Sequence, residues 1–152
     1  MYYFDKQKAS ILNLLNRVIP HYNARELREQ LAGQPLDTLR QIARNNLERV
    51  VSIQLMDLGL QPHMNGYAYC REAICQALTS GAPLGNLTQD CYAKIAAEFE
   101  KSIESVERAM RLAIRNAWEH HSQLRETLQT QFCPTNREFI AKVAELIRVQ
   151  YL

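Results

Sequence analysis

Two helical patterns joined by a tight turn, within residues 89–121, constrain the fold of this chain more than any other feature. The first pattern places Cys91, Ile95 and Phe99 on one side, and the Thr88 hydroxyl can cap its first free amides. The chain must turn after Phe99 before the second pattern begins. We therefore predict a helix-turn-helix, with the rest of the chain as its support.

The second helix of this unit is strongly amphipathic. Ser102 is placed to cap it, and the pattern continues to Trp118 or beyond. At about 100° per residue, apolar and charged side chains separate onto opposite sides. The apolar side holds Ile103, Val106, Met110, Ala113, Ile114 and Ala117, and the charged side holds Glu104, Glu107, Arg108, Arg111 and Arg115.

The charged side suits the chemistry of DNA bases. Arginine presents a planar fork that can bond guanine O6 and N7 together, and a carboxylate can accept a hydrogen bond from cytosine N4 in the same groove. Glu107 beside Arg108 is therefore a candidate base-reading pair. The alternative is an ordinary solvated face, in which Glu104 pairs with Arg108 and Glu107 with Arg111 at i,i+4 spacing.

Three separated segments carry a resemblance to a known family. They are GYAYCREAI at 66–74, VERAMRLAIRNAW at 106–118 and PTNREFIAKVAELIR at 134–148. In this order they resemble the C-terminal effector domain of the stage-zero sporulation protein A, the master response regulator of sporulating Firmicutes. The resemblance runs from about Leu47 to the C-terminus and implies a compact six-helix DNA-binding domain.

The resemblance also implies roles for particular residues. In that family the glutamate and both arginines of the VERAxR pattern reach base edges, which implies that Glu107, Arg108 and Arg111 do so here. Candidate backbone or flanking contacts surround them, namely Lys101, Ser102, Glu104, Ser105, Leu112 and Arg115.

Four positions depart from the family pattern. Glu100 stands where the turn usually has Asn, Ser105 where an arginine is frequent, Leu112 where a histidine is found, and Cys133 where a lysine precedes the PTN motif. The last three changes each remove or weaken a possible DNA contact. Leu112 lies at the margin of the charged side, where it either touches a thymine methyl group or packs into the core.

The whole chain is expected to be all-α, a helical bundle that contains the helix-turn-helix. Of its 152 residues 47% are apolar, only 5 are Gly and 5 are Pro, and strand-like alternation is nowhere sustained. A long helix starts near Pro35 and its apolar stripe persists to Gly59, with a break near Asn45 and Asn46 as the alternative. Further helices are expected over 5–19, 23–33, 67–78 and from about 135 onward, with a loop over 80–86.

Two parts follow from this pattern. Residues 1–46 form a short helical N-terminal segment, and residues 47–152 form the DNA-binding domain. The segment is too short for the receiver domain that precedes this effector domain in the family, so we expect phosphorylation control to be missing. Its apolar stripes exceed what two short helices can bury, so it packs back on the domain or pairs with a second chain. We favour a homodimer, because dimers engage two half-sites.

Composition limits the remaining classes of protein. A net charge of +2 neither demands nor excludes a polyanion. No apolar run is long enough to cross a bilayer and no signal peptide is evident, so a soluble, cytoplasmic protein is expected. The four cysteines have no CxxC spacing and are interpreted as reduced, mostly buried thiols rather than as a metal site, and no cofactor is expected.

We therefore predict a sequence-specific, DNA-binding transcriptional regulator. Glycine-rich phosphate loops, paired catalytic carboxylates and nucleophile motifs are missing, so we expect no enzyme. The alternative is an interaction protein that keeps the fold and antagonises the sporulation regulator or RNA polymerase. Family members contact RNA polymerase and the adjacent protomer through the region after Trp118, and this region is shorter here.

Overall fold

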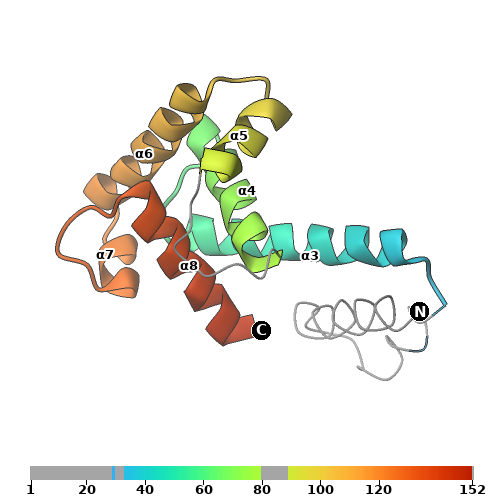
Figure 1. The fold of residues 1–152 in the computed structure, drawn as a ribbon. Helices are drawn as coiled ribbons and strands as arrows, with labels where there is room; N and C mark the ends of the chain where they lie inside the picture. Colours follow the sequence, from blue (N-terminus) through green and yellow to red (C-terminus); the bar gives the residue numbers. More distant parts are fainter. Residues whose placement is uncertain (1–28, 30–32, 80–88, 152) are drawn as a thin grey trace.

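The computed structural model describes residues 29, 33–79 and 89–151. In this part of the chain all regular structure is helical, which confirms the predicted all-α fold (Figure 1). The helices are α3 (Leu36–Asp57), α4 (Asn65–Thr79), α5 (Gln89–Glu98), α6 (Ile103–His120), α7 (Gln123–Leu128) and α8 (Asn136–Tyr151). The helices expected over 5–19 and 23–33, the cap at Thr88 and the loop over 80–86 fall outside the described residues, apart from Glu29 and Gly33.

Helix α3 runs without interruption past Asn45 and Asn46, so the alternative of a break there is wrong. Both asparagines are hydrogen-bonded along the helix instead of competing with it. The Asn46 side-chain amide donates to the Ile42 carbonyl (2.9 Å), and the Asn45 side-chain oxygen accepts from the Gln41 amide (2.9 Å). One helix therefore crosses the predicted boundary between residues 46 and 47.

The C-terminal end of α3 is closed by glycine. Gly59 has a φ of 96°, in the left-handed region. The Leu60 N–H donates to the Leu55 carbonyl (3.0 Å) and the Gly59 N–H to the Met56 carbonyl (3.0 Å). This pair of bonds is the Schellman arrangement, which satisfies the last carbonyls of a helix and turns the chain sharply.

Helix α4 lies at the centre of the bundle and contacts α3, α5, α6 and α8. Its start touches the backbone of α6, because a Cβ atom added at Gly66 would lie 2.0 Å from the Ala109 carbonyl oxygen. Farther along, Cys70 and Cys75 are buried free thiols, whereas Cys91 and Cys133 are only partly buried, so the predicted burial holds for two of the four. The close contact at Gly66 requires a glycine where α4 and α6 meet.

Helix α7 is absent from the sequence-based expectations. It has six residues, of which two are apolar: Leu124 is fully buried, and Leu128 is partly buried against the core. The Arg125 guanidinium also lies over the Trp118 ring, 4.4 Å from its centroid. Two apolar positions are too few to establish a helical period, so only tertiary packing reveals this helix.

Helix α8 closes the core against α4 and α6. Phe139, Val143 and Ile147 on one side of it are fully buried, as their spacing predicts. At its start the Thr135 hydroxyl accepts a hydrogen bond from the Glu138 N–H (3.2 Å). Thr135 is therefore the capping residue.

Candidate nucleic-acid interface

The turn between α5 and α6 has the same backbone arrangement as the end of α3. The Lys101 N–H donates to the Ala96 carbonyl (2.8 Å), and the Glu100 N–H to the Ala97 carbonyl (3.4 Å). Glu100 takes the left-handed position with a φ of 53°. Glutamate is strained there, whereas glycine or asparagine is not. The tight turn predicted after Phe99 is thus formed despite an unfavourable residue.

Ser102 begins the second helix as predicted. Its backbone is extended, and its hydroxyl oxygen accepts a hydrogen bond from the Ser105 N–H (3.1 Å). The two serine hydroxyls are also bonded to each other at 2.9 Å. The cap uses one of the free amides at the start of α6 and leaves those of Ile103 and Glu104 directed outward from the helix end.

The apolar side of α6 faces the core. Val106, Met110 and Ala113 have no exposed surface, and Ile114 and Ala117 are buried as well. Ile95 and Ala96 of α5 are also buried. This packing holds α5 and α6 as one helix-turn-helix and confirms the predicted inner face.

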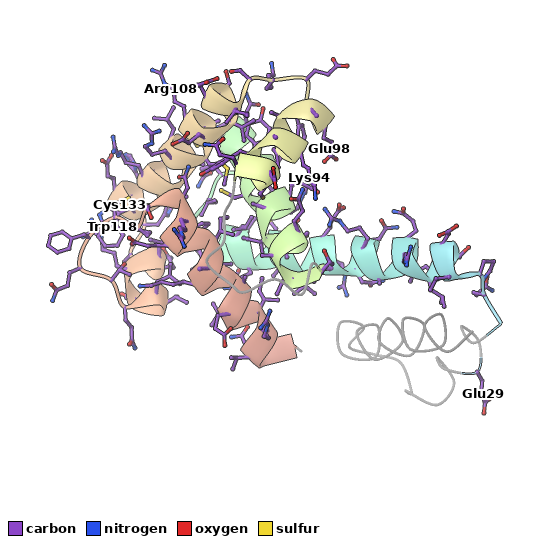
Figure 2. All side chains as sticks on the ribbon, viewed as in Figure 1. Glu29, Lys94, Glu98, Arg108, Trp118 and Cys133 are labelled. Carbon is purple, nitrogen blue, oxygen red and sulfur yellow. The ribbon has the colours of Figure 1, made fainter. Side chains whose placement is uncertain are left out.

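The charged side of α6 faces away from the bundle. Arg108 is exposed near the start of the helix, on its outer side (Figure 2). Arg111 and Glu107 form an ion pair at 3.6 Å, with side chains that remain 54% and 46% exposed. One of the two i,i+4 pairs expected for a solvated face is therefore present, and its partners stay accessible.

The residues predicted to flank the base-reading positions are all exposed. Glu104, Ser105, Leu112 and Arg115 share one arc of α6 with Arg108, and Lys101 and Ser102 lie in the turn before it. Leu112 is 48% exposed. Its alternative role as a core residue is therefore wrong.

Asn136 is a contributor to this site that the sequence alone did not identify. Its side chain is buried, and its amide donates to the carbonyl of Glu107 in α6 (3.0 Å) and to the Tyr92 hydroxyl in α5 (3.3 Å). Burial raises the pKa of Tyr92, while the hydrogen bond to Asn136 opposes that shift. Thr135 caps α8, so the Asn136 side chain is available to bond the other two helices, and nothing in the sequence identifies those partners.

Two observations bear on other classes of site. Within residues 33–79 and 89–151, no three His, Cys, Asp or Glu side chains lie together as metal ligands would. None of the helices that the structure describes is both long and apolar enough to span a membrane.

One comparison with known families bears on the site. Residues 51–147 match the family model described as "Sporulation initiation factor Spo0A C terminal". The matched range begins in the C-terminal half of α3 and ends near the end of α8, so it contains the whole helix-turn-helix and Asn136.

Proposed function

Because the chain belongs to the Spo0A C-terminal family, whose members are DNA-binding effector domains of sporulation regulators, we propose that it is a sequence-specific transcriptional regulator that reads DNA with α6. An α-helix about 10–12 Å across fits the major groove of B-form DNA, which is about 12 Å wide. The outer side of α6 would enter the groove, and the turn at Glu100 would lie at its edge.

The base-reading roles are assigned to three side chains. Arg108 would bond guanine O6 and N7, Glu107 would accept a hydrogen bond from cytosine N4, and Arg111 would reach a neighbouring base. The observation that carries this assignment is the exposure of Arg108, whose fork is not ion-paired with any carboxylate in the described part of the chain.

Phosphate contacts would come from both ends of the reading face. The outward amides of Ile103 and Glu104, together with Lys101 and Ser102, can meet one strand at the start of α6. Arg115 can meet the other strand about three turns along. Ser105 and Leu112 lie between these groups, and an exposed Leu112 can contact a thymine methyl group.

Fluorescence-anisotropy titration tests this proposal. The purified protein is titrated against duplexes with a sporulation-type direct-repeat box and a scrambled sequence, at several salt concentrations. We expect a preference for the box of about a thousandfold. Arg108→Ala should weaken binding to the box by about 1–3 kcal/mol. Arg108→Lys should also reduce the preference for the box over the scrambled duplex, but it should keep the salt dependence of binding because the charge remains. Equal losses on both duplexes would contradict base reading by Arg108.

A second candidate function is that of an interaction protein that keeps the fold and antagonises the sporulation regulator or RNA polymerase. Exposed Leu112 on the reading face favours it, because an apolar side chain there suits a protein surface better than a phosphate backbone. Co-purification with such a partner without DNA would support this function. A strictly DNA-dependent association would contradict it.

We also propose that the regulator binds DNA as a homodimer or as tandem copies, since two linked half-sites raise affinity without new contacts. Light scattering gives the mass of the free protein and of its complexes with DNA that carries one or two boxes. These masses distinguish a homodimer from copies that bind in tandem. No cofactor, metal or catalytic step is part of the proposal, and a family of DNA-binding domains supports that expectation.

A further inference from the structure

Asn136 occupies an unusual place in the core. Among the described residues, Asn136 is the one polar or charged residue that is buried. Its amide group joins three helices, because it starts α8, donates to the Glu107 carbonyl of α6 at 3.0 Å, and donates to the Tyr92 hydroxyl of α5 at 3.3 Å. Both bonds end on the helix-turn-helix.

Capping does not explain why asparagine stands here. Thr135 accepts the bond from the Glu138 N–H, so α8 already has its cap. The Asn136 side-chain oxygen is buried and has no hydrogen-bond partner in the described structure. An unpaired buried acceptor is unfavourable, and an apolar residue of similar shape would remove that penalty. The two bonds that the Asn136 amide donates therefore come with a cost that a residue needed only for packing would not carry.

The bond to Glu107 lies on the part of α6 that carries the proposed base-reading residues. Glu107 and Arg108 lie one turn after the cap at Ser102, and a donor from α8 on the Glu107 carbonyl opposes rotation of α6 about its axis. The bond to Tyr92 ties the same amide to α5, so one side chain contacts both helices of the helix-turn-helix. A bidentate contact to a base tolerates an error of about half an ångström or 10–20°.

We propose that Asn136 is a positioning residue for base reading, whose amide sets the rotation of α6 against α5 so that Glu107 and Arg108 meet base edges. This inference rests on the proposed reading of DNA by α6. Asn136 itself is buried behind the helix and does not touch DNA.

The variant Asn136→Leu tests the proposal in the full chain, with Thr135→Ala as the matched control. Both change the start of α8, but only the first removes the donor to Glu107. We expect Asn136→Leu to remain folded and to lower the ratio of box to scrambled affinity by about tenfold, equivalent to a poor fit at one base pair. The salt dependence should be unchanged, because no phosphate contact is lost. Thr135→Ala should keep the ratio.

The outcomes are distinguishable. An unchanged ratio in Asn136→Leu, with a wild-type protein that prefers the box, overturns this inference alone. A wild-type protein without preference overturns both this inference and the proposed function. An equal fall of the ratio in Thr135→Ala also overturns the inference, because any disturbance of α8 would then suffice. If leucine does not fit and the protein fails to fold, Asn136→Ala takes its place with the same criteria.

Discussion

The inner and outer faces of α6 place opposite demands on their residues. The inner face holds Val106, Met110 and Ala113 without exposed surface, and the backbone at Ala109 touches Gly66 of α4. The outer face holds exposed Arg108 and its neighbours, which contribute little to packing. Changes on the inner face should therefore alter stability, and changes on the outer face should alter binding. An outer residue whose substitution unfolds the protein would break this comparison.

The largest effect is expected at Gly66. A methyl group there would meet the Ala109 carbonyl oxygen at 2.0 Å, and backbone cannot move aside as a flexible side chain does. Gly66→Ala should lower the free energy of unfolding by at least about 3 kcal/mol, measured by urea denaturation. Gly33→Ala is the control, because nothing lies within 4 Å of its added Cβ, and it should stay within about 0.5 kcal/mol. Similar values for both would contradict the close contact.

The buried thiols of α4 predict a pH dependence. Burial raises the pKa of Cys70, and it raises that of Cys75 to about 12, against the opposing effect of Arg44. Unfolded thiols ionise near their ordinary pKa of 9.0 while the native ones stay protonated. The unfolded state then binds fewer protons, so the stability present below pH 9.0 is lost as pH rises above it.

Urea denaturation at a series of alkaline pH values measures this loss. Each buried thiol should contribute a slope of up to about 1.4 kcal/mol per pH unit. Cys70→Ala should reduce the pH dependence of the free energy of unfolding by the contribution of one thiol, whatever its effect on stability at neutral pH. Cys133→Ala should change the slope less, because that thiol is only partly buried. An unchanged slope in Cys70→Ala would show that this thiol ionises in the folded protein.

The fold was largely predictable from the sequence because its helices are long and periodic. The apolar stripes of α3, α6 and α8 identified their inner faces, and Ser102 marked the start of α6. Helix α7 was missed because it is short and has only two apolar residues, buried Leu124 and partly buried Leu128. The contact at Gly66 was missed because a glycine inside a helical pattern does not identify the backbone that approaches it.

The candidate site was predictable in part. The outer position of Arg108 and Arg111 follows from helical periodicity. The buried link through Asn136 does not, because Tyr92, Glu107 and Asn136 are distant in sequence and meet only through the packing of α8 on the helix-turn-helix. The roles of Glu107, Arg108 and Arg111 in DNA binding stay predictions.

A smaller effect is expected at the turn before α6. The end of α3 places Gly59 in the left-handed conformation, and the end of α5 places Glu100 there with the same pair of hydrogen bonds. Glu100→Gly should raise the free energy of unfolding by about 1 kcal/mol, because it relieves backbone strain. It should also strengthen binding to both duplexes, since it removes a carboxylate beside the expected phosphate contacts.

Gln129→Gly is the matched control for that change. Gln129 has a φ of 51° at the end of α7, outside the helix-turn-helix. The Gln129→Gly substitution should stabilise the protein by a similar amount, about 1 kcal/mol, without effect on DNA affinity. Equal effects of the two variants on DNA binding would mean that general stability, rather than the charge at the turn, governs affinity.

The smallest effect on stability is expected for the ion pair of the outer face. Glu107 and Arg111 lie 3.6 Å apart, with side chains 46% and 54% exposed, so water screens their attraction. A double-mutant cycle with Glu107→Gln and Arg111→Gln should give a coupling of about 0.3–0.5 kcal/mol in the free protein. On the box duplex, Glu107→Gln should cost more, about 1–3 kcal/mol, because the carboxylate then faces a base. A weak internal pair can exchange its partners for base edges at little cost to folding, whereas a coupling above about 1 kcal/mol would mean that the outer face also serves stability.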